Sequence, residues 1–336
     1  MLDYNPPKTS LNAGPFKIFL DCAGEISFVS HAHFDHATGL NSSKTIIASE
    51  ATADLLEARG ISTAGLDFQP FFGRGGVKIE LLDSGHVLGS SMMYAEFDST
   101  SFLYTGDFKL QDSLIGPAAK PKKCEWLLIE TTYGSPEYKF PERREVYADL
   151  SRWVSQQQKM GHSTVFGGYS LGKAQELVKV LNEFVGVAPI VSEEIAKVCK
   201  VYEKHGVRLD VVRSGTEEAE EILRHRFTAV LPHHQVGPEL AKNLAEHYGR
   251  PVATALATGW AAGSKRMFSA DAVFPLSDHC DFDHLLKFVE ACEPEKIVCN
   301  HGFEKEFSAE LRKRGWAAVA ISELGKTQQK ALAEYG

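Results

Sequence analysis

The sequence has no long apolar run, no closely paired cysteines and no excess of positive charge, and each absence narrows the class of protein. No stretch approaches the roughly 18 apolar residues that a membrane-spanning helix requires, so we expect no membrane partner. The first residues lack the basic and apolar regions of a secretion signal, and the six cysteines are scattered as in a cytoplasmic protein with reduced thiols. The formal net charge of −8 argues against coating nucleic acid through bulk charge, but it leaves open an enzyme whose metals and local lysines supply the positive field.

Short apolar runs that end in polar turns dominate the first part of the chain. The runs are rich in β-branched and aromatic residues and are bounded by Gly, Ser and Asp, which is typical of strands. Polar groups just past the ends of several strands are how a layered α/β scaffold assembles a site from distant segments. The runs and the polar groups that follow them are 17–20 with Asp21, 26–29 with a histidine cluster, 77–82 with His86, and 101–104 with Asp107.

The middle of the chain alternates strand-like and helix-like segments. Ser192 precedes a helical stretch to Lys204, and its hydroxyl is suited to capping that helix. Such alternation predicts βαβ units on a parallel sheet. Because the last residues return to the strand-then-ligand pattern, we expect an inserted α/β domain at 136–262 within a domain formed by 1–135 and 263–336.

The hexapeptide His31-Ala32-His33-Phe34-Asp35-His36 is the most informative segment of the chain. Imidazole and carboxylate ligands suit Zn²⁺, Mn²⁺ or Fe. The alternation of His31 and His33 lets both face one ion, while Asp35 and His36 begin the next turn and can face a second. A solvated His-rich loop is the weaker interpretation, because later ligands complete the motif.

His86 and Asp107 are those later ligands. Alone, His86 would be a packed or capping histidine and Asp107 a turn aspartate. Both follow strands, in the order that a two-metal site needs, and the two carboxylate oxygens of Asp107 can bridge two ions. We expect Asp21, also at a strand end, to orient a ligand imidazole rather than to bind metal.

Taken in order, H-x-H-x-D-H, the later Gly-His and Thr-Gly-Asp resemble the metallo-β-lactamase superfamily. The resemblance implies an α/β class with a four-layer αββα fold and a dinuclear site, with two Zn²⁺ ions or Mn²⁺ or Fe in place of one or both. It assigns His31, His33 and His86 to one metal and Asp35 and His36 to the other, with Asp107 as the bridge.

Three later segments resemble the extra motifs of the β-CASP nucleases within that superfamily. They are Glu130 to Gly134, Ser277-Asp278-His279, and Asn300-His301-Gly302, and the α/β insertion between the first two resembles a compact β-CASP domain. The segment Thr132 to Pro141 is similar to the DNA crosslink-repair and Artemis-type nucleases. Ser277 to Phe282 is similar to prokaryotic ligase-associated DNA exonucleases.

His301 departs from the crosslink-repair pattern, which usually has an apolar residue there, whereas RNA-processing members have histidine. The ligase-associated enzymes resemble this chain at His301, so the residue leaves RNA open as the substrate without requiring it. It also suggests a complete ligand set for the second metal.

The implied chemistry is two-metal hydrolysis of a phosphodiester. Asp35 would position the attacking water or take its proton. His279 is the candidate general acid, with Glu130 fixing its tautomer or raising its basicity. Two alternatives stay open for His279: a ligand of the second metal, or a surface residue of an acidic loop.

A strand-to-helix turn is expected to bind a substrate phosphate through backbone N–H groups and an ammonium. In the crosslink-repair relatives the resembling region binds a terminal 5′-phosphate, which implies 5′→3′ polarity. The alternative for this turn is an ordinary helix start. The basic run at 265–266 is interpreted equally as a patch that follows the nucleic-acid backbone or as solvated surface. The predicted substrate-binding residues are Ser135, Tyr169, Ser170, Gly172 and Lys173.

These patterns favour a hydrolase: a 5′→3′ exonuclease on single-stranded DNA with a repair-type role and a possible association with repair proteins. An RNase of the 3′-end-processing kind is second, and a small-molecule hydrolase such as a thioesterase is third. A non-enzymatic scaffold subunit is fourth, because such subunits lose metal ligands and none is lost here. The sequence does not specify the oligomeric state.

Overall fold

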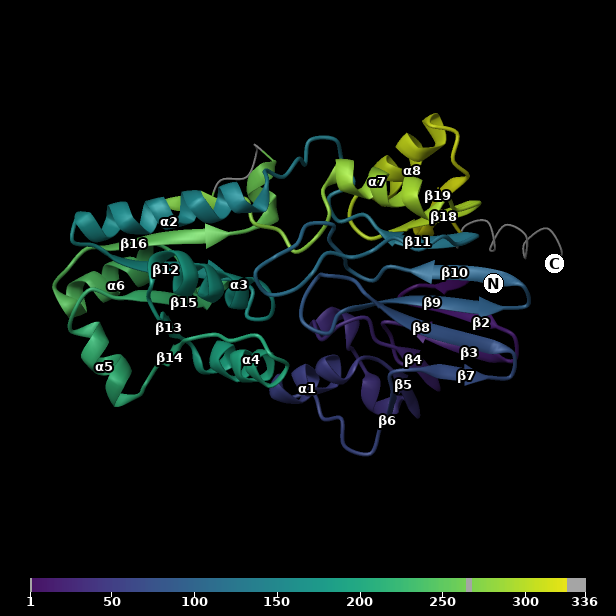
Figure 1. Cartoon of the computed structure of the whole chain (residues 1–336), viewed down its shortest axis with the longest axis horizontal. Coiled ribbons are helices and arrows are strands. Elements are labelled where there is room, and N and C mark those ends of the chain that lie inside the picture. The colour runs from purple at the N-terminus through teal and green to yellow at the C-terminus, as the bar shows by residue number, and fades with distance from the viewer. Residues whose placement is uncertain (1, 264–267, 325–336) are drawn as a thin grey trace. The chain divides into compact units, whose positions relative to one another are not determined.

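The structure is a computed structural model that describes residues 2–263 and 268–324, and it divides into two compact units (Figure 1). Unit 1 comprises Met1–Gln111, Pro117–Tyr138 and His279–Gly336, and unit 2 comprises Asp112–Gly116 and Lys139–Asp278. Unit 2 thus extends beyond the predicted end of the insertion at residue 262. The reason is that β17 (Ala272–Phe274) pairs with β16 (Val252–Ala257) in the sheet of unit 2.

Unit 1 is built on two sheets. The first has the strand order β1-β2-β3-β4-β5-β6, and the second has the order β19-β18-β11-β10-β9-β8-β7. The first sheet contains β1 (Leu2–Asn5), β2 (Lys8–Ala13), β3 (Phe16–Leu20), β4 (Ile26–Phe28), β5 (Thr45–Ile47) and β6 (Asp67–Gln69). The second contains β7 (Phe72–Arg74), β8 (Val77–Asp83), β9 (Ser91–Phe97), β10 (Thr100–Tyr104), β11 (Trp126–Glu130), β18 (Lys296–Asn300) and β19 (Ala318–Ala320).

The helices of unit 1 are α1 (Glu50–Ala58), α7 (Phe282–Cys292) and α8 (Glu304–Lys313), with 3₁₀ turns η1 (Phe34–His36) and η2 (Leu40–Ser42). Asp281 caps the N-terminus of α7, and its carboxylate accepts a hydrogen bond from the His284 N–H at 2.8 Å. Its apolar residues recur at helical spacing, so one face is buried.

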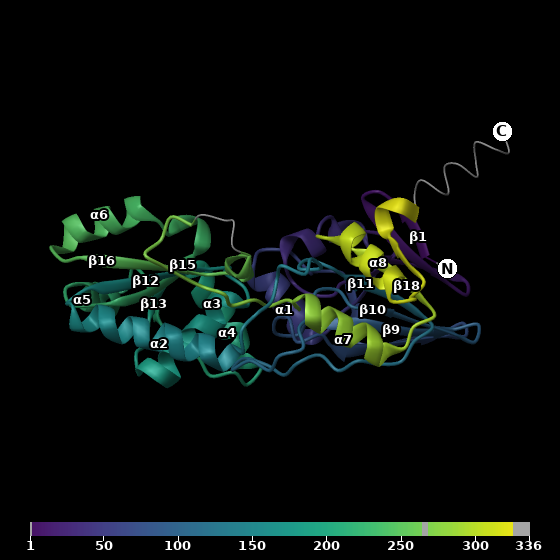
Figure 2. The ribbon, with the colours of Figure 1, turned by 90° about the horizontal axis from the view of Figure 1, so that it is seen from above.

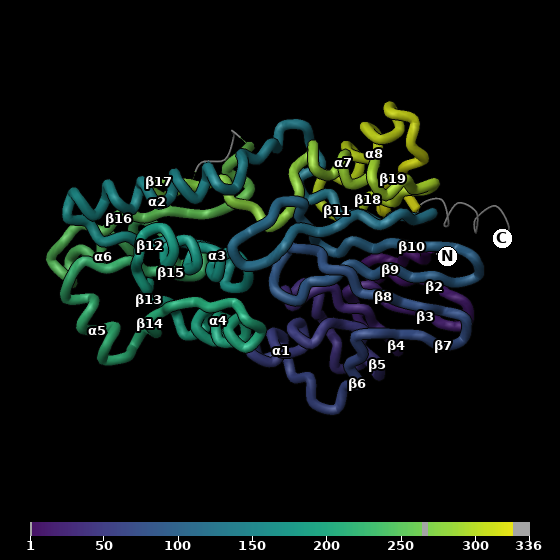
Figure 3. The backbone as a smooth tube through the Cα atoms, in the orientation of Figure 1, coloured from purple at the N-terminus to yellow at the C-terminus, as the bar shows by residue number. Residues whose placement is uncertain are grey.

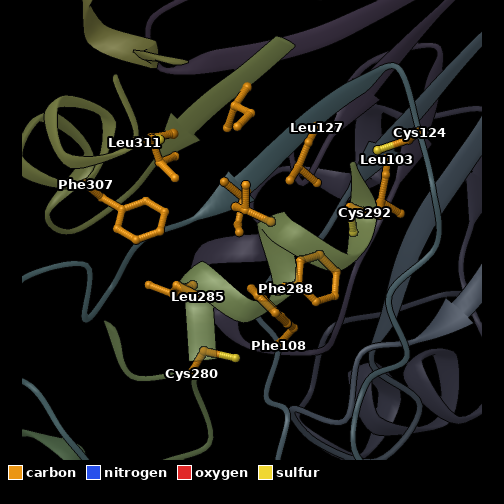
Figure 4. Packing of buried hydrophobic residues seen from close by; sticks show 14 of the residues in the cluster. Leu103, Phe108, Cys124, Leu127, Cys280, Leu285, Phe288, Cys292, Phe307 and Leu311 are labelled. Atoms are coloured by element: carbon orange, nitrogen blue, oxygen red, sulfur yellow. The ribbon is translucent and has the colours of Figure 1, made fainter. Parts of the chain in front are cut away.

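The second sheet is packed on both faces, as neighbouring residues of β10 illustrate. Phe102 lies in the core between the two sheets, together with Ile18 of β3 and Met93 of β9. Leu103 points to the opposite face, as strand geometry requires, and joins a core formed with α7 and α8 (Figure 4). Figure 2 shows α7 and α8 beside β10, β11 and β18.

Unit 2 contains one parallel sheet, in the order β14-β13-β15-β12-β16-β17 (Figure 3). The predicted βαβ alternation is confirmed, and Ser192 caps α4 by accepting from the Ile195 N–H at 3.3 Å. The other strands are β12 (Ser163–Gly168), β13 (Ile190–Val191), β14 (Val212–Arg213) and β15 (Thr228–Pro232). The helices are α2 (Arg143–Lys159), α3 (Lys173–Val180), α4 (Glu193–Lys204), α5 (Glu217–Leu223) and α6 (Pro238–Tyr248), with the π-helical η3 (Leu181–Val185) and the 3₁₀ turns η4 (His233–Gln235) and η5 (Gly259–Ala262).

Within the described residues, no helix combines the length and apolar character needed to cross a membrane.

Candidate metal centre

Four predicted ligands converge at one edge of unit 1. His31 and His33 follow β4, His86 follows β8, and Asp107 follows β10. His33 Nδ1 lies 2.8 Å from His31 Nε2 and 3.2 Å from His86 Nε2. One ligand atom from each of the four residues lies within 4.8 Å of the others, so together they could hold one metal ion.

Asp107 connects this group to a second one. Its Oδ2 lies 3.6 Å from His31 Nε2, 3.7 Å from His86 Nε2 and 3.5 Å from His36 Nε2. His36 Nε2 is also 3.6 Å from Asp35 Oδ2, and the ring centroids of His36 and His301 are 6.3 Å apart. The structure therefore places one carboxylate oxygen beside both predicted ligand groups.

Backbone conformation brings these loops close together. Gly106 has φ +51°, and a Cβ added there would lie 2.5 Å from Ser30 Cβ, so glycine is needed for the Asp107 turn to approach the histidine loop. His301 itself has φ +69°, a left-handed conformation that is uncommon for a non-glycine residue. Such conformations concentrate at functional sites, where the surrounding structure maintains them.

Asp21, predicted to orient a ligand imidazole, makes hydrogen bonds with the histidine loop, and its orienting role stays a prediction. Its carboxylate accepts from the Ser30 N–H at 2.6 Å, the Ser30 hydroxyl at 2.7 Å and the Tyr104 hydroxyl at 2.7 Å. His36 Nδ1 lies 2.8 Å from the same carboxylate and therefore carries the proton as donor. In the neutral ring, which is the form that binds a metal, this tautomer leaves the lone pair of His36 Nε2 facing Asp35 and Asp107.

Ser30 fixes the tautomer of His31 in a similar way. Because its single hydroxyl proton goes to Asp21, its oxygen accepts from His31 Nδ1 at 2.9 Å. His31 Nε2 is then the lone-pair nitrogen that faces the cluster. Ser30 and Tyr104 were not predicted from the sequence, although each stands directly beside a predicted ligand turn.

The electrostatics of the cluster fit a bound cation. Burial, reinforced by the neighbouring histidines, holds the pKa of His31 well below its usual value, so this imidazole is neutral and able to bind metal. Burial opposes charging of His36, but Asp107, Asp21 and Asp35 outweigh it and raise the pKa of His36 to about 10. The carboxylates thus stabilise positive charge where a cation would lie. The nitrogen and oxygen donors suit zinc, manganese or iron.

Asp21→Asn is expected to weaken metal binding at the His36 side by about 10- to 100-fold, because the amide no longer holds the imidazole in the ligand tautomer. Zinc titration against a competing chelator measures this affinity. Asp3→Asn, which changes an exposed ion pair with Lys17, is the matched control. Affinity equal to that of the unsubstituted chain would contradict the orienting role of Asp21.

A second pair, His279 and Glu130, lies in the same unit. His279 Nδ1 is 2.9 Å from Glu130 Oε1, and Glu130 also accepts from the Phe108 N–H at 3.2 Å and the Thr132 N–H at 2.9 Å. Burial disfavours the Glu130 anion, but His279 and the bonds from His279 and Thr132 outweigh burial and lower the pKa of Glu130. An ionised Glu130 accepts the Nδ1 proton, so His279 Nε2 carries the reactive lone pair or proton.

The position of His279 is compatible with both predicted roles. Its ring centroid lies 4.7 Å from that of His86, and donor atoms of Asp107, Glu130 and His279 lie within 4.8 Å of one another. The histidine can therefore serve as a proton donor beside the ligand cluster or as a further ligand. The general-acid role stays a prediction.

The residues predicted to bind a phosphate fall in both units. Ser135 is in unit 1, and the turn from Tyr169 to Lys173 is in unit 2. The Gly172 N–H donates to Gln175 Oε1 at 2.7 Å, and the Lys173 ammonium is buried 3.0 Å from Asp278 Oδ1. Both groups therefore have internal partners, and their contact with a phosphate stays a prediction. The basic run at 265–266 lies outside the described residues.

Comparison with known proteins gives long matches. The chain is 33% identical over 305 residues to a "Probable DNA ligase" of Opitutus terrae, covering 88% of this chain and 29% of that protein. It is 27% identical over 297 residues to "5′ exonuclease Apollo" of Gallus gallus, covering 84% of this chain and 61% of that protein. The chain thus spans less than two thirds of either relative, and no family model matches it.

A solved structure supports the fold. A crystal structure of a protein of unknown function from Enterococcus faecalis V583 superposes with a TM-score of 0.56 at 15% identity, covering 83% of this chain and 76% of that one. This likeness concerns the mixed α/β fold alone. The relatives above are consistent with the resemblance of the ordered motifs to the β-CASP nucleases of the metallo-β-lactamase superfamily.

Proposed function

We propose that this protein is a metal-dependent phosphodiesterase that cleaves nucleic acid. The observation that carries the proposal is the Asp107 carboxylate oxygen within 3.7 Å of His31, His36 and His86, in the same unit as the His279–Glu130 pair. Unit 1, with its two facing sheets and α7 and α8 on one outer face, supports the four-layer αββα fold. Unit 2 then corresponds to the compact β-CASP insertion.

Two zinc ions suit the donors, with manganese or iron in place of one or both. His31, His33 and His86 would hold one, Asp35, His36 and His301 would hold the other, and Asp107 would bridge them. Bound divalent cations lower the pKa of water and neutralise charge on phosphoryl oxygens.

The side chains of unit 1 supply the remaining steps. Asp35, whose side chain is 69% exposed, is accessible for positioning the attacking water and accepting its proton. His279 donates a proton to the leaving oxygen, and Glu130 holds the imidazole in the tautomer that this requires.

DNA is the favoured substrate, with 5′→3′ exonuclease action on single strands and a role in repair. The name of the Gallus gallus relative, a 5′ exonuclease, and the ligase named in the Opitutus terrae match support this assignment. RNA is the second candidate, because this chain has a histidine, His301, where RNA-processing members have one, with its ring centroid 6.3 Å from that of His36.

The decisive experiment compares one single-stranded sequence as DNA and as RNA, each with or without a 5′-phosphate and labelled at the 3′ end. The full chain is loaded with Zn²⁺ or Mn²⁺, and His33→Ala is the control. The expected result is a ladder that shortens from the 5′ end of DNA, is stimulated by the 5′-phosphate and is absent in His33→Ala.

Cleavage confined to RNA would replace the DNA assignment by the RNA alternative. Hydrolysis of bis(p-nitrophenyl) phosphate without cleavage of either strand would indicate a small-molecule hydrolase. No hydrolysis of any substrate by the metal-loaded chain would indicate a scaffold and overturn the proposal.

A further inference from the structure

Tyr169 and His233 lie at the same edge of the parallel sheet of unit 2. Strands β12 and β15 pair in parallel, with Gly168 opposite Pro232. Tyr169 immediately follows β12 and His233 immediately follows β15, so both lie at the carboxyl edge of the sheet. Their rings are in contact, with centroids 4.6 Å apart and an interplanar angle of 48°.

The segments that follow these two strands pack on opposite faces of the sheet. A Cβ added at Gly168 would lie 3.0 Å from Lys173 Cγ of α3, whereas one added at Gly167 would lie 3.1 Å from Val236 Cβ, just before α6. Successive residues of a strand face opposite sides, so α3 and the chain leading to α6 diverge between β12 and β15. Figure 2 shows α6 on the side of the sheet opposite α2.

The carboxyl ends of adjacent parallel strands whose following segments diverge in this way are the usual location for ligands in open α/β sheets. The glycines support the geometry: a side chain at Gly167 would also come within 3.2 Å of His233 Cα. The strand end therefore has no side chain that would displace the His233 turn.

The chemistry exposed at this point is aromatic. Tyr169 is 50% exposed, so its ring is accessible to a ligand. Burial, with His234 beside it, lowers the pKa of His233, so its imidazole is neutral at pH 7. The adjacent cation in the turn, Lys173, is buried against Asp278. A neutral pair of rings favours a flat π surface as its ligand over a bare phosphate.

We propose that Tyr169 and His233 form a stacking subsite for one unpaired nucleobase of the substrate strand. The proposal rests on the proposed nucleic-acid substrate and extends it to a position and a ligand class. Stacking on aromatic side chains is sequence-tolerant, because every base has a π face. DNA and RNA offer the same surface, so the subsite is expected to accept both.

The test measures binding of labelled single strands to the full chain in the His33→Ala background, which prevents cleavage. Three strands of equal length are used: oligothymidylate, oligouridylate and an abasic deoxyribose phosphate strand. Adding Tyr169→Ala is expected to weaken binding of the base-bearing strands by roughly 5- to 150-fold, with no change for the abasic strand. Tyr169→Phe is expected to retain affinity, and His233→Ala to weaken it.

Phe184→Ala is the matched control, because Phe184 is an aromatic residue of unit 2 that is 54% exposed. An equal loss on the abasic strand, or no loss on any strand, would overturn the stacking subsite, as would a background chain that binds no base-bearing strand. A loss on only one of the thymidylate and uridylate strands would restrict the subsite to that nucleic acid. Cleavage by the metal-loaded unsubstituted chain is scored separately, so failure of the nuclease proposal is distinguishable from failure of the subsite.

Discussion

Replacing His279 by alanine is expected to lower the cleavage rate of a DNA strand by roughly 10²- to 10⁴-fold, the usual contribution of a positioned general acid. The leaving alkoxide of a phosphodiester must be protonated, and the Glu130 contact to Nδ1 directs Nε2 of His279 away from that carboxylate. The buried Glu130 is fixed by two backbone N–H groups, so the imidazole is oriented before substrate arrives.

A change of leaving group separates the acid role of His279 from a ligand role. A p-nitrophenyl ester of thymidine monophosphate releases an anion that needs no proton, so His279→Ala is expected to hydrolyse it with a much smaller loss. Metal content of the variant is expected to equal that of the unsubstituted chain. Equal losses on both substrates together with a lost ion would instead make His279 a metal ligand.

Glu130→Gln is expected to lower the cleavage rate of DNA less than His279→Ala does. It is also expected to move the basic limb of the pH–rate profile to lower pH. The sign follows from the charge: a general acid acts in its protonated form, and a neighbouring carboxylate stabilises that form. Removing the carboxylate charge lets the proton leave at lower pH. Glu306→Gln, on the exposed face of α8, is the control and should leave the profile unchanged. An unshifted profile in Glu130→Gln would reduce Glu130 to a structural role.

The ligand cluster was predictable because its chemistry is local in the sequence. His31, His33, Asp35 and His36 share one turn, and His86 and Asp107 each follow a strand with a clear apolar pattern. The contacts of Tyr104 were not predictable in the same way. Whether a strand residue reaches Asp21, 83 positions earlier, depends on the register and facing of two sheets.

Some strands and one domain boundary were also not predictable from the local sequence. Strands β5, β6 and β7 have three residues each, too few for a period-two pattern to be distinctive. The far boundary of the insertion depends on β17 pairing with β16, a tertiary contact that composition does not encode. The burial of Lys173 was not predictable from the local sequence either, because its partner Asp278 is distant in the chain.

Replacing Lys173 by methionine is expected to destabilise unit 2 by about 3–5 kcal/mol, because Asp278 would be left as a buried charge without its ammonium partner. Lys173 is 2% exposed and Asp278 is 6% exposed, so water cannot compensate for the lost pair. Burial lowers the pKa of Lys173, while Asp278 and Glu176 act in the opposite direction.

This ion pair belongs to a larger buried network. Arg143 Nη1 lies 2.6 Å and 2.8 Å from the two carboxylate oxygens of Glu176, which also accepts from the Tyr147 hydroxyl. Arg143 donates in addition to the carbonyl of Ser277, the residue before Asp278. The network thus fixes Ser277 and Asp278 at the end of unit 2, immediately before His279 in the chain.

Urea denaturation, monitored through hydrogen exchange of the α2 and α3 amides, measures the loss of stability within unit 2. Lys197→Met is the matched control, since Lys197 lies 3.9 Å from Glu193 in an exposed pair and should cost about 0–1 kcal/mol. The double variant Lys173→Met with Asp278→Leu should recover part of the stability, because both buried charges are then removed. If Lys173→Met instead keeps full stability and loses only the preference for a 5′-phosphate, the lysine is a substrate ligand and not part of the buried network.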